Sequence, residues 1–405
     1  MRVRAIAIFL ISVVALTLFS ATEGALRAQR GEGGDLATEW LGDQGPLPPV
    51  LVATLRQDPY PFFRRVNRVW SERVCRAFSA EKMPSVRLHG DAHVEQYGLT
   101  STAHGLDDFD DSAEGPAVVD LVRFIGSLDL AAARRGWQSH ANHAIDQFLK
   151  GYQQALRDPS YVPRTPNIVE RLRARQPPGS AAFLASSDQR MEPVSPLVDS
   201  QAREALALVA AEDTSKPPGF FTLKRIGALQ MGVGSYTTPK YLMRVEGPSP
   251  ADDDDVILEA KEVSDLSGVS CITTPNDGKA VRVLTGLRQI GRLKLEVLSV
   301  IRGLSAAREW WLRSWDRTYV EVRIPDLRSS RDLEQLALDA GAQLGRASLP
   351  PATAPAAVRE RERATIARLE PRIRQVAANL SREMRTAWEQ FRVANSPPVS
   401  SKPSP

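Results

Sequence analysis

The segment from residue 89 to residue 120, HGDAHVEQYGLTSTAHGLDDFDDSAEGPAVVD, concentrates side chains that could do chemistry. It holds eight carboxylates and three of the chain's five histidines. Acids at this density repel one another, so a folded protein keeps them on open surface or around a cation. Leu106 and Phe109 interrupt the acids, which favours short strands whose ends present carboxylates to one spot. The sequence therefore predicts a cradle for a hard cation, which prefers oxygen ligands.

The order of motifs in this segment resembles that of aminoglycoside phosphotransferases and choline kinases, small-molecule kinases related to the protein kinases. The chain has HGD at 89–91, a polar residue five positions after the aspartate at Gln96, DF at 108–109 and DL at 120–121. More closely, most of residues 57–348 resembles an uncharacterised bacterial family, domain of unknown function 2252. Its members read roughly GDAHxxNFG, NDFDE, GPxxWDLKR, GVGSxG and KE. Since that family implies no particular reaction, the expected mechanism comes from the kinase likeness.

The kinase likeness implies a catalytic role for the loop that carries HGD. Asp91 would orient or deprotonate an acceptor hydroxyl, because that step needs a carboxylate within hydrogen-bond reach. His89 would brace the loop. Asp120 would anchor the loop backbone rather than react.

The same likeness implies a metal site beside this loop. Asp108 would hold Mg²⁺ or Mn²⁺ bridging the phosphates of ATP or another nucleotide, with Asp110 as a second ligand or its support. Gln96 stands where the pattern has Asn, the other cation ligand. Its amide oxygen can still coordinate, but the longer side chain moves that oxygen by about one bond length.

A glycine-rich stretch, GVGSYTTPK, lies between two expected strands. In kinases such a hairpin covers the nucleotide phosphates and a lysine on a later strand contacts them. The likeness therefore assigns Gly232, Gly234, Ser235 and Lys261 to nucleotide binding. Strand alternation places Lys261 on the same face as Glu259. An exposed strand lysine fits this spacing equally well.

The motif order differs from that of kinases, which place the glycine-rich lobe first. Here the HGD half comes first, and chains tolerate such permutation when the original termini lie close together. We therefore expect an α+β, two-lobed, protein-kinase-like fold in circularly permuted order. A helical catalytic lobe at 57–215 would precede a β-rich nucleotide-binding lobe at 216–330, and a C-terminal helical extension would occupy 331–395.

Two departures from the kinase pattern favour an alternative function. Gln96 replaces the metal-binding Asn, and Thr285 stands where kinases carry the helix Glu that pairs with the lysine. Export adds a third argument, because ATP is scarce outside the cytoplasm. The alternative is a catalytically degenerate kinase-like binding protein of the cell envelope.

A third hypothesis is a metal-dependent hydrolase. Histidine and aspartate clusters can hold zinc and leave one coordination position open. The candidate ligands are His89, Asp91, His93 and His104. The HGDAH spacing is not the helical HExxH arrangement, and loop hydrogen bonding is the simpler role for His93 and His104.

Residues 1–28 carry a basic start, MRVR, then the uncharged apolar run AIAIFLISVVALTLFSA and small residues. This pattern is typical of a secretory signal, so we expect export to the periplasm. The run is close to the length that spans a bilayer, so an uncleaved N-terminal anchor is the alternative. Residues 29–56 read as a linker, and the Pro- and Ser-rich end at 396–405 reads as disordered.

Composition limits the classes of partner that this protein is expected to bind. The formal net charge is +4, and the basic residues form no patch with interleaved aromatics, which argues against nucleic acid. The kinase likeness implies a nucleotide and an unknown small-molecule or protein acceptor; it does not predict an oligomeric state. Cys75 and Cys271 could pair in an exported protein. Two buried free thiols are an equal alternative.

Hydrophobic periodicity and turn residues predict the elements that position these motifs. We expect helices at 57–82, at 117–157 with a break at Gly136, and at 199–212, 278–303, 331–348 and 356–393. The last of these should pack on the body rather than form a dimer seam. We expect strands at 86–91, within 219–264 and at 317–325, and irregular structure at 182–197.

Overall fold

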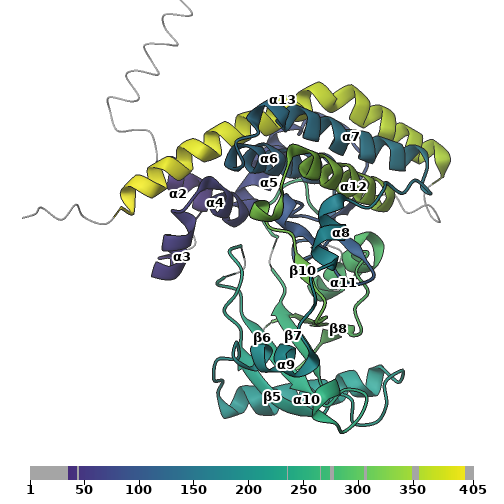
Figure 1. Cartoon of the computed structure of the whole chain (residues 1–405). Coiled ribbons are helices and arrows are strands. Elements are labelled where there is room, and N and C mark those ends of the chain that lie inside the picture. The colour runs from purple at the N-terminus through teal and green to yellow at the C-terminus, as the bar shows by residue number, and fades with distance from the viewer. Residues whose placement is uncertain are drawn as a thin grey trace, which may run out of the picture.

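The computed structural model describes residues 35–42, 45–234, 236–264, 266–273, 278–304, 308–348 and 355–396. The described chain is an α+β protein in which most helices gather at one end and the largest sheet at the other (Figure 1). The predicted signal at 1–28, Ser235 and nearly all of the predicted tail lie outside the described residues. Among the described helices, none combines the length and the apolar character that a membrane span requires.

The helical half takes in two stretches that lie far apart in the sequence. Its helices are α2 (Leu36–Leu41), α3 (Pro49–Leu55), α4 (Pro59–Arg65), α5 (Asn67–Ala77), α6 (Val118–Arg134), α7 (Ala141–Arg157), α8 (Asn167–Arg173), α12 (Ser330–Ser348) and α13 (Ala356–Ala394). Helix α6 is buried along most of its length, and α13 runs along the outer side of the half, over α6 and α7 (Figure 1).

Helices α7 and α12 approach closely because glycines face each other across their contact. A Cβ on Gly341 would lie 2.0 Å from the carbonyl oxygen of Phe148, and one on Gly151 would lie 2.1 Å from that of Leu338. Any larger side chain would push the two backbones apart. The helix predicted at 331–348 is thereby confirmed, and it packs against residues nearly two hundred positions earlier in the chain.

The long C-terminal helix also matches its prediction. Its apolar stripe, which includes Ile366, Ile373 and Met384, is buried against the helical half. Pro371 lies inside the helix. The stripe therefore packs on the body of the same chain, as expected for a surface helix with one apolar face.

The sheet half contains five antiparallel strands in the order β5-β6-β7-β9-β8. They are β5 (Leu223–Ala228), β6 (Lys240–Val245), β7 (Val256–Glu262), β8 (Leu298–Ile301) and β9 (Trp310–Ser314). Helix α11 (Lys279–Ile290) connects β7 to β8, and α9 (Ser180–Asp188) and α10 (Pro196–Glu212) cover the sheet. The predicted boundary at residue 216 thus falls after two helices that pack on the sheet.

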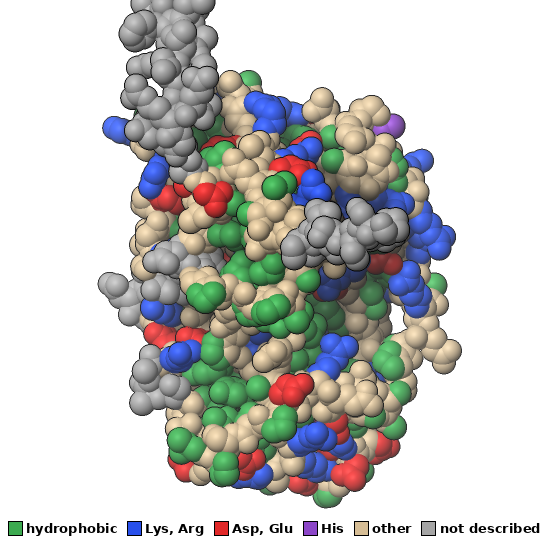
Figure 2. All heavy atoms as spheres, turned by 90° about the vertical axis from the view of Figure 1, so that its left-hand side faces the viewer, with side chains coloured by type: hydrophobic (Ala, Val, Ile, Leu, Met, Phe, Trp, Pro, Cys, Tyr) green, Lys and Arg blue, Asp and Glu red, His purple; other side chains and the backbone are tan. Residues whose placement is uncertain are grey.

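Alternation along β7 gives the sheet two different faces. Leu258 and Ala260 pack with α10 in an apolar cluster, whereas Glu259 and Lys261 line a cleft on the opposite face. The predicted shared face of Glu259 and Lys261 is confirmed. Figure 2 shows the junction of the two halves from one side, with hydrophobic side chains gathered across the middle of the molecule.

Two small sheets lie between the halves and carry the acidic loops. Strand β1 (Val86–Leu88) pairs antiparallel with β4 (Ala113–Gly115), and β2 (Tyr97–Leu99) lies between β3 (His104–Leu106) and β10 (Val320–Glu321). The HGD loop therefore follows a strand directly, as the sequence indicated.

Several predicted elements are wrong in extent. The helix predicted at 57–82 is two helices, since the backbone breaks at Val66 between α4 and α5. The helix predicted at 278–303 ends at Ile290, before Gly291, and the chain then forms β8. Residues 182–197 are not irregular, because they include most of α9 and the start of α10.

The strand prediction near the end of the sheet half is also wrong. Within 317–325 only Val320–Glu321 is a strand. Trp310–Ser314, with the sequence WWLRS, forms β9 instead. The residues read as a linker at 29–56 include α2 and α3, and Trp40 of α2 is fully buried.

Cys75 of α5 and Cys271 form a disulfide. The sequence left pairing and free thiols equally open, and the structure decides for pairing. The bond joins the segment that follows β7 to the helical half. A second contact supports the same junction, since the Ser270 amide donates to Glu72 of α5 at 2.7 Å.

Candidate functional site

The HGD loop is held by its backbone at the end of β1. The Asp120 carboxylate in the first turn of α6 accepts from the amides of His89 at 2.7 Å and Gly90 at 2.9 Å. Gly90 has φ +86°, and a Cβ there would lie 1.8 Å from the carbonyl oxygen of Asp111. Only glycine fits this position, so the HGD loop and the DFDD loop have to touch. Asp120 anchors the backbone, as the kinase likeness implied.

His89 braces the same pair of loops. Its Nε2 lies 2.9 Å from the carbonyl oxygen of Asp107, and its Nδ1 accepts from the Asp91 amide at 3.3 Å. In this arrangement Nε2 donates and Nδ1 accepts. His89 is fully buried, so it contacts the loops and not the cleft.

Asp91 forms a buried ion pair with Arg123, one turn after Asp120 on α6. The Arg123 Nε donates to Asp91 Oδ1 at 2.9 Å, and the guanidinium lies 3.6 Å from the centre of the Phe63 ring. Asp91 Oδ2 lies 3.7 Å from His93 Nε2. Burial raises the pKa of Asp91 to about 7, although the charge of Arg123 opposes the rise.

Asp108 adopts an unusual backbone conformation. With φ +62°, it is the one non-glycine residue of positive φ in the described part of the chain. Such residues persist where the surroundings hold them and often occur at functional sites. Its Oδ2 accepts from Gln96 Nε2 at 3.3 Å, and its Oδ1 accepts from Lys261 Nζ at 2.8 Å.

Lys261 brings the sheet half to the DFDD loop. Its Nζ also donates to Asp110 Oδ2 at 3.1 Å, and Asp110 Oδ1 accepts from Trp311 Nε1 at 3.1 Å. Burial raises the pKa of Asp110 to about 7, and the neighbouring charge of Asp108 adds to the rise. For Asp108, the charge of Lys261 overcomes burial and holds the pKa well below its usual range.

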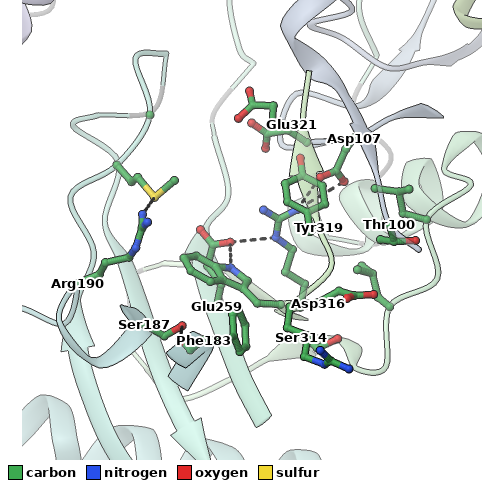
Figure 3. A pocket seen from close by; sticks show the side chains of 18 of the residues that line it. Thr100, Asp107, Phe183, Ser187, Arg190, Glu259, Ser314, Asp316, Tyr319 and Glu321 are labelled. Carbon is green, nitrogen blue, oxygen red and sulfur yellow. Dashed lines mark hydrogen bonds and ion pairs between the residues drawn. The ribbon is translucent and has the colours of Figure 1, made fainter. Parts of the chain in front are cut away.

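Asp107 is also paired with a cation, and Asp111 with a neutral amide. Arg313 of β9 donates to Glu259 at 2.9 Å and to Asp107 at 3.3 Å (Figure 3). Asp111 accepts from Asn67 at 2.9 Å. The cations that the acid density demanded are therefore supplied in large part by the chain's own lysine and arginines.

Two hollows meet at Asp108. The larger has a volume of about 610 Å³ and lies between the cleft face of the sheet and the acidic loops (Figure 3). Lys240, Lys261 and Asp108 line it at one side, and Phe183 and Trp315 add aromatic surface. The smaller, of about 290 Å³, contains Asp91, Asp110 and Asp111. Asp108, Gln96, Arg64, Gly232 and Val233 line both hollows.

The glycine-rich turn reaches the helical half. Gly232 has φ +90°, which favours glycine. The Arg65 side chain of α4 donates to the carbonyl oxygen of Gly234 at 2.6 Å. The turn thus lies over both hollows, beside the acids. Ser235, the third residue predicted for this turn, lies outside the described residues.

The oxygen donors suit a hard cation in their chemistry. Within the described ranges, no group of three or more His, Cys, Asp or Glu side chains is arranged as a metal site. Asp108 and Asp110 each accept two internal hydrogen bonds, with Lys261 between them. Each carboxylate oxygen has a second lone pair, and the Asp108 side chain is 32% exposed. Asp108, with Asp110 and Gln96 beside it, can therefore accept a divalent cation from the cleft.

The zinc set of the hydrolase hypothesis is not brought together. His104 lies 3.8 Å from Asp339 of α12 and faces the Tyr97 ring, away from the HGD loop. His93 is fully buried beside Tyr60, and burial lowers its pKa well below the usual range.

Some site residues were missed by the sequence reasoning. Arg123 could have been found, because it stands three positions after Asp120 and so shares its helix face. Arg282 of α11 donates to the carbonyl oxygens of Asp110 at 3.1 Å and Ser264 at 2.8 Å. The Thr285 hydroxyl donates within its own helix, at 2.8 Å to the carbonyl oxygen of Val281. Helix α11 thus presents Arg282 to the acidic loop, three positions before Thr285, which stands where the kinase pattern has a Glu.

Comparison with known proteins finds a match to a protein family, but that family has no assigned activity. Residues 47–207 match the model of a family described as "Uncharacterized protein conserved in bacteria (DUF2252)". The match covers the HGDAH and DFDD motifs but ends before the glycine-rich turn and Lys261. No curated protein and no solved structure matches the chain significantly.

Proposed function

We propose that this chain, whose residues 47–207 match the model of an uncharacterised bacterial family, is a kinase-like phosphotransferase. The reaction would transfer a phosphoryl group from a nucleotide to an unknown small-molecule or protein acceptor, with Mg²⁺ or Mn²⁺. One observation carries the proposal. Lys261 Nζ lies 2.8 Å from Asp108 and 3.1 Å from Asp110, although more than 150 residues separate them in the chain.

The arrangement around Lys261 supports this proposal. In protein kinases a glycine-rich hairpin covers the phosphates, a lysine on the third strand contacts them, and the aspartate of a DFG loop binds the metal. Here the hairpin of β5 and β6 carries the glycine-rich turn, and Lys261 lies on β7, the third strand in sheet order. Asp108 would take the role of the metal-binding aspartate of that loop. The sheet half would then be the nucleotide lobe of a circularly permuted kinase-like fold.

The larger hollow suits an amphipathic ligand. Its volume of about 610 Å³ lies within the usual range for small-molecule sites. Basic groups would face the phosphates at the Lys261 side, and the aromatic surface of Phe183 and Trp315 would face a base. Figure 3 shows Phe183 on the side of the hollow opposite Asp107.

The chain's own groups would act as follows. Asp91 would accept the proton of the acceptor hydroxyl through Oδ2, since Oδ1 is bonded to Arg123. A pKa near 7 suits a general base at neutral pH. His89 and Asp120 hold the loop that aims Asp91, and Lys261 would contact the phosphates. When bound at Asp108, Asp110 and Gln96, Mg²⁺ would neutralise charge on the transferring group.

Phosphorus NMR of the protein with Mg·ATP tests the reaction, with water or an added polyol mixture as acceptor. We expect ADP to form with the wild type and not with Asp91→Asn, while Asp91→Asn still binds Mg·ATP. Absence of ADP with both proteins, alongside tight binding by both, would overturn the transfer reaction.

The second candidate is a catalytically degenerate binding protein of the cell envelope. The ion pair of Asp91 with Arg123 favours it, because a base held by a buried guanidinium is less free to accept a proton. Gln96 and Thr285 favour it too. We propose export from the predicted signal at 1–28, and export would limit the ATP supply. Binding of Mg·ATP without product is the result that separates this candidate from the enzyme.

A further inference from the structure

Lys240 stands beside Lys261 on the cleft face of the sheet. It is the first residue of β6, and it is the register partner of Lys261 on β7. Both residues are buried, at 4% and 5% exposure, and both line the larger hollow. No motif of the sequence pointed to Lys240.

Two buried ammonium groups on adjacent strands repel each other. Burial lowers the pKa of Lys240 and the charge of Lys261 lowers it further, whereas Glu259 and Asp110 act in the opposite direction. A folded protein keeps like charges together where an ion of opposite sign can lie between them. The acids of the DFDD loop do this for Lys261, so Lys240 adds positive charge to the same wall of the hollow.

Lys240 also contacts the glycine-rich turn. Its Nζ donates to the carbonyl oxygen of Met231, directly before Gly232. An ammonium is a hydrogen-bond donor and carries a positive charge, and Lys240 lines the larger hollow, so an oxyanion bound there would meet this charge. The turn, Lys240 and Lys261 therefore line the same part of the larger hollow.

We propose that Lys240 is a second phosphate-binding lysine. It contacts a polyphosphate chain from the β6 side while Lys261 contacts it from β7, and its bond to Met231 places the turn over the same phosphates. The ligand class is a triphosphate bound with a divalent cation, either as a nucleotide or as inorganic triphosphate. This inference rests on the proposed function.

Isothermal titration with Mg²⁺ and four probes tests it: ATP, ADP, AMP and inorganic tripolyphosphate. Loss of a charge-assisted hydrogen bond should weaken ATP and tripolyphosphate binding by about tenfold or more in Lys240→Met. AMP should bind as to the wild type. Lys240→Arg should recover most of the affinity, and Lys240→Gln repeats the test with a polar side chain. Lys150→Met, at an exposed position of α7, is the matched control.

The outcomes distinguish a failure of the Lys240 inference from a failure of the proposed function. Equal ATP affinity in the wild type and in Lys240→Met or Lys240→Gln overturns the inference and leaves the nucleotide site standing. An equal loss for AMP and ATP also overturns it, because Lys240 would then act only through the turn. A wild type that binds none of the probes overturns the proposed function itself. Tripolyphosphate binding as tight as ATP supports the inference and identifies an inorganic ligand; much tighter ATP identifies a nucleotide.

Discussion

The ammonium of Lys261 lies 2.8 Å from the carboxylate of Asp108. This contact joins the third strand of the sheet half to the acidic loop of the helical half. Asp110 lies against the same ammonium at 3.1 Å. Two like-charged carboxylates and one lysine therefore form a unit whose members depend on each other.

Replacing two members of this unit should cost less than the sum of the two single replacements. Lys261→Met leaves two partly buried carboxylates without their cation, and loss of one partner of a fully buried pair, the upper limit here, costs about 3–5 kcal/mol. In Lys261→Met/Asp108→Asn one of the uncompensated charges is gone. We expect the double variant to be more stable than the sum of the single losses implies. Urea unfolding in a double-mutant cycle measures this coupling, and strictly additive losses would contradict the contact.

Stability should depend on pH through Glu362 of α13, which is distant from the site. Burial raises the pKa of Glu362 to about 7, and the ordinary value in an unfolded chain is 4.5. The folded state then binds the proton more tightly. The contribution of Glu362 to the free energy of unfolding is fully present below about pH 4.5. It is lost as the pH rises to 7 and above.

The Glu362→Gln variant tests this dependence. It should be more stable than the wild type at pH 8, by roughly 1–3 kcal/mol, with little gain at pH 4. Urea unfolding at the two pH values gives both numbers. A difference between the two proteins that stays constant with pH would show that Glu362 does not titrate in this way.

The disulfide should stabilise the wall of the smaller hollow. It joins residues 196 positions apart, and a cross-link over a long loop contributes about 2–5 kcal/mol. Leu266, Val269 and Ile272, next to Cys271, line the smaller hollow. Reduction, or Cys75→Ala/Cys271→Ala, should lower the melting temperature and speed hydrogen exchange at 266–273. Unchanged exchange there after reduction would mean that the hydrogen bonds of Glu72 and Arg68 hold this segment without the disulfide.

Turnover should rise with pH if Asp91 is the base. Its pKa is raised to about 7 by burial, and only the ionised carboxylate can accept the proton of a hydroxyl. ADP release from Mg·ATP should therefore increase from pH 5.5 to a plateau above about pH 8, with Asp91→Asn as the background. A flat profile over this range would assign the proton transfer to another group.

The sequence could predict what is local. Asp91, Asp108 and Asp110 were expected beside one another because each follows a short strand or an apolar residue at a strand end, and the structure brings them together. Strand alternation placed Lys261 and Glu259 on one face. These features depend on the two-residue alternation of strands and on short loop motifs, and both are visible in a single amino-acid sequence.

Tertiary partners could not be predicted in the same way. Arg313 lies in WWLRS, a stretch without alternation, so neither β9 nor its ion pairs had a signal. Helix α9 has no apolar stripe, since its sequence, SAAFLASSD, is small and mixed all round. Lys240 follows a proline and two threonines and reads as a loop end. Each was decided by packing against segments distant in sequence.

The most direct test of the account is the melting temperature of the protein with and without Mg·ATP. A ligand at one hundred times its dissociation constant stabilises the folded state by about 2.7 kcal/mol, which should raise the melting temperature by several degrees. We expect this rise for the wild type and for Glu362→Gln, and none for Asp108→Asn or Lys261→Met. A wild type that does not respond, or a Lys261→Met variant that responds equally, would contradict the claim that Lys261 and Asp108 form a nucleotide and metal site.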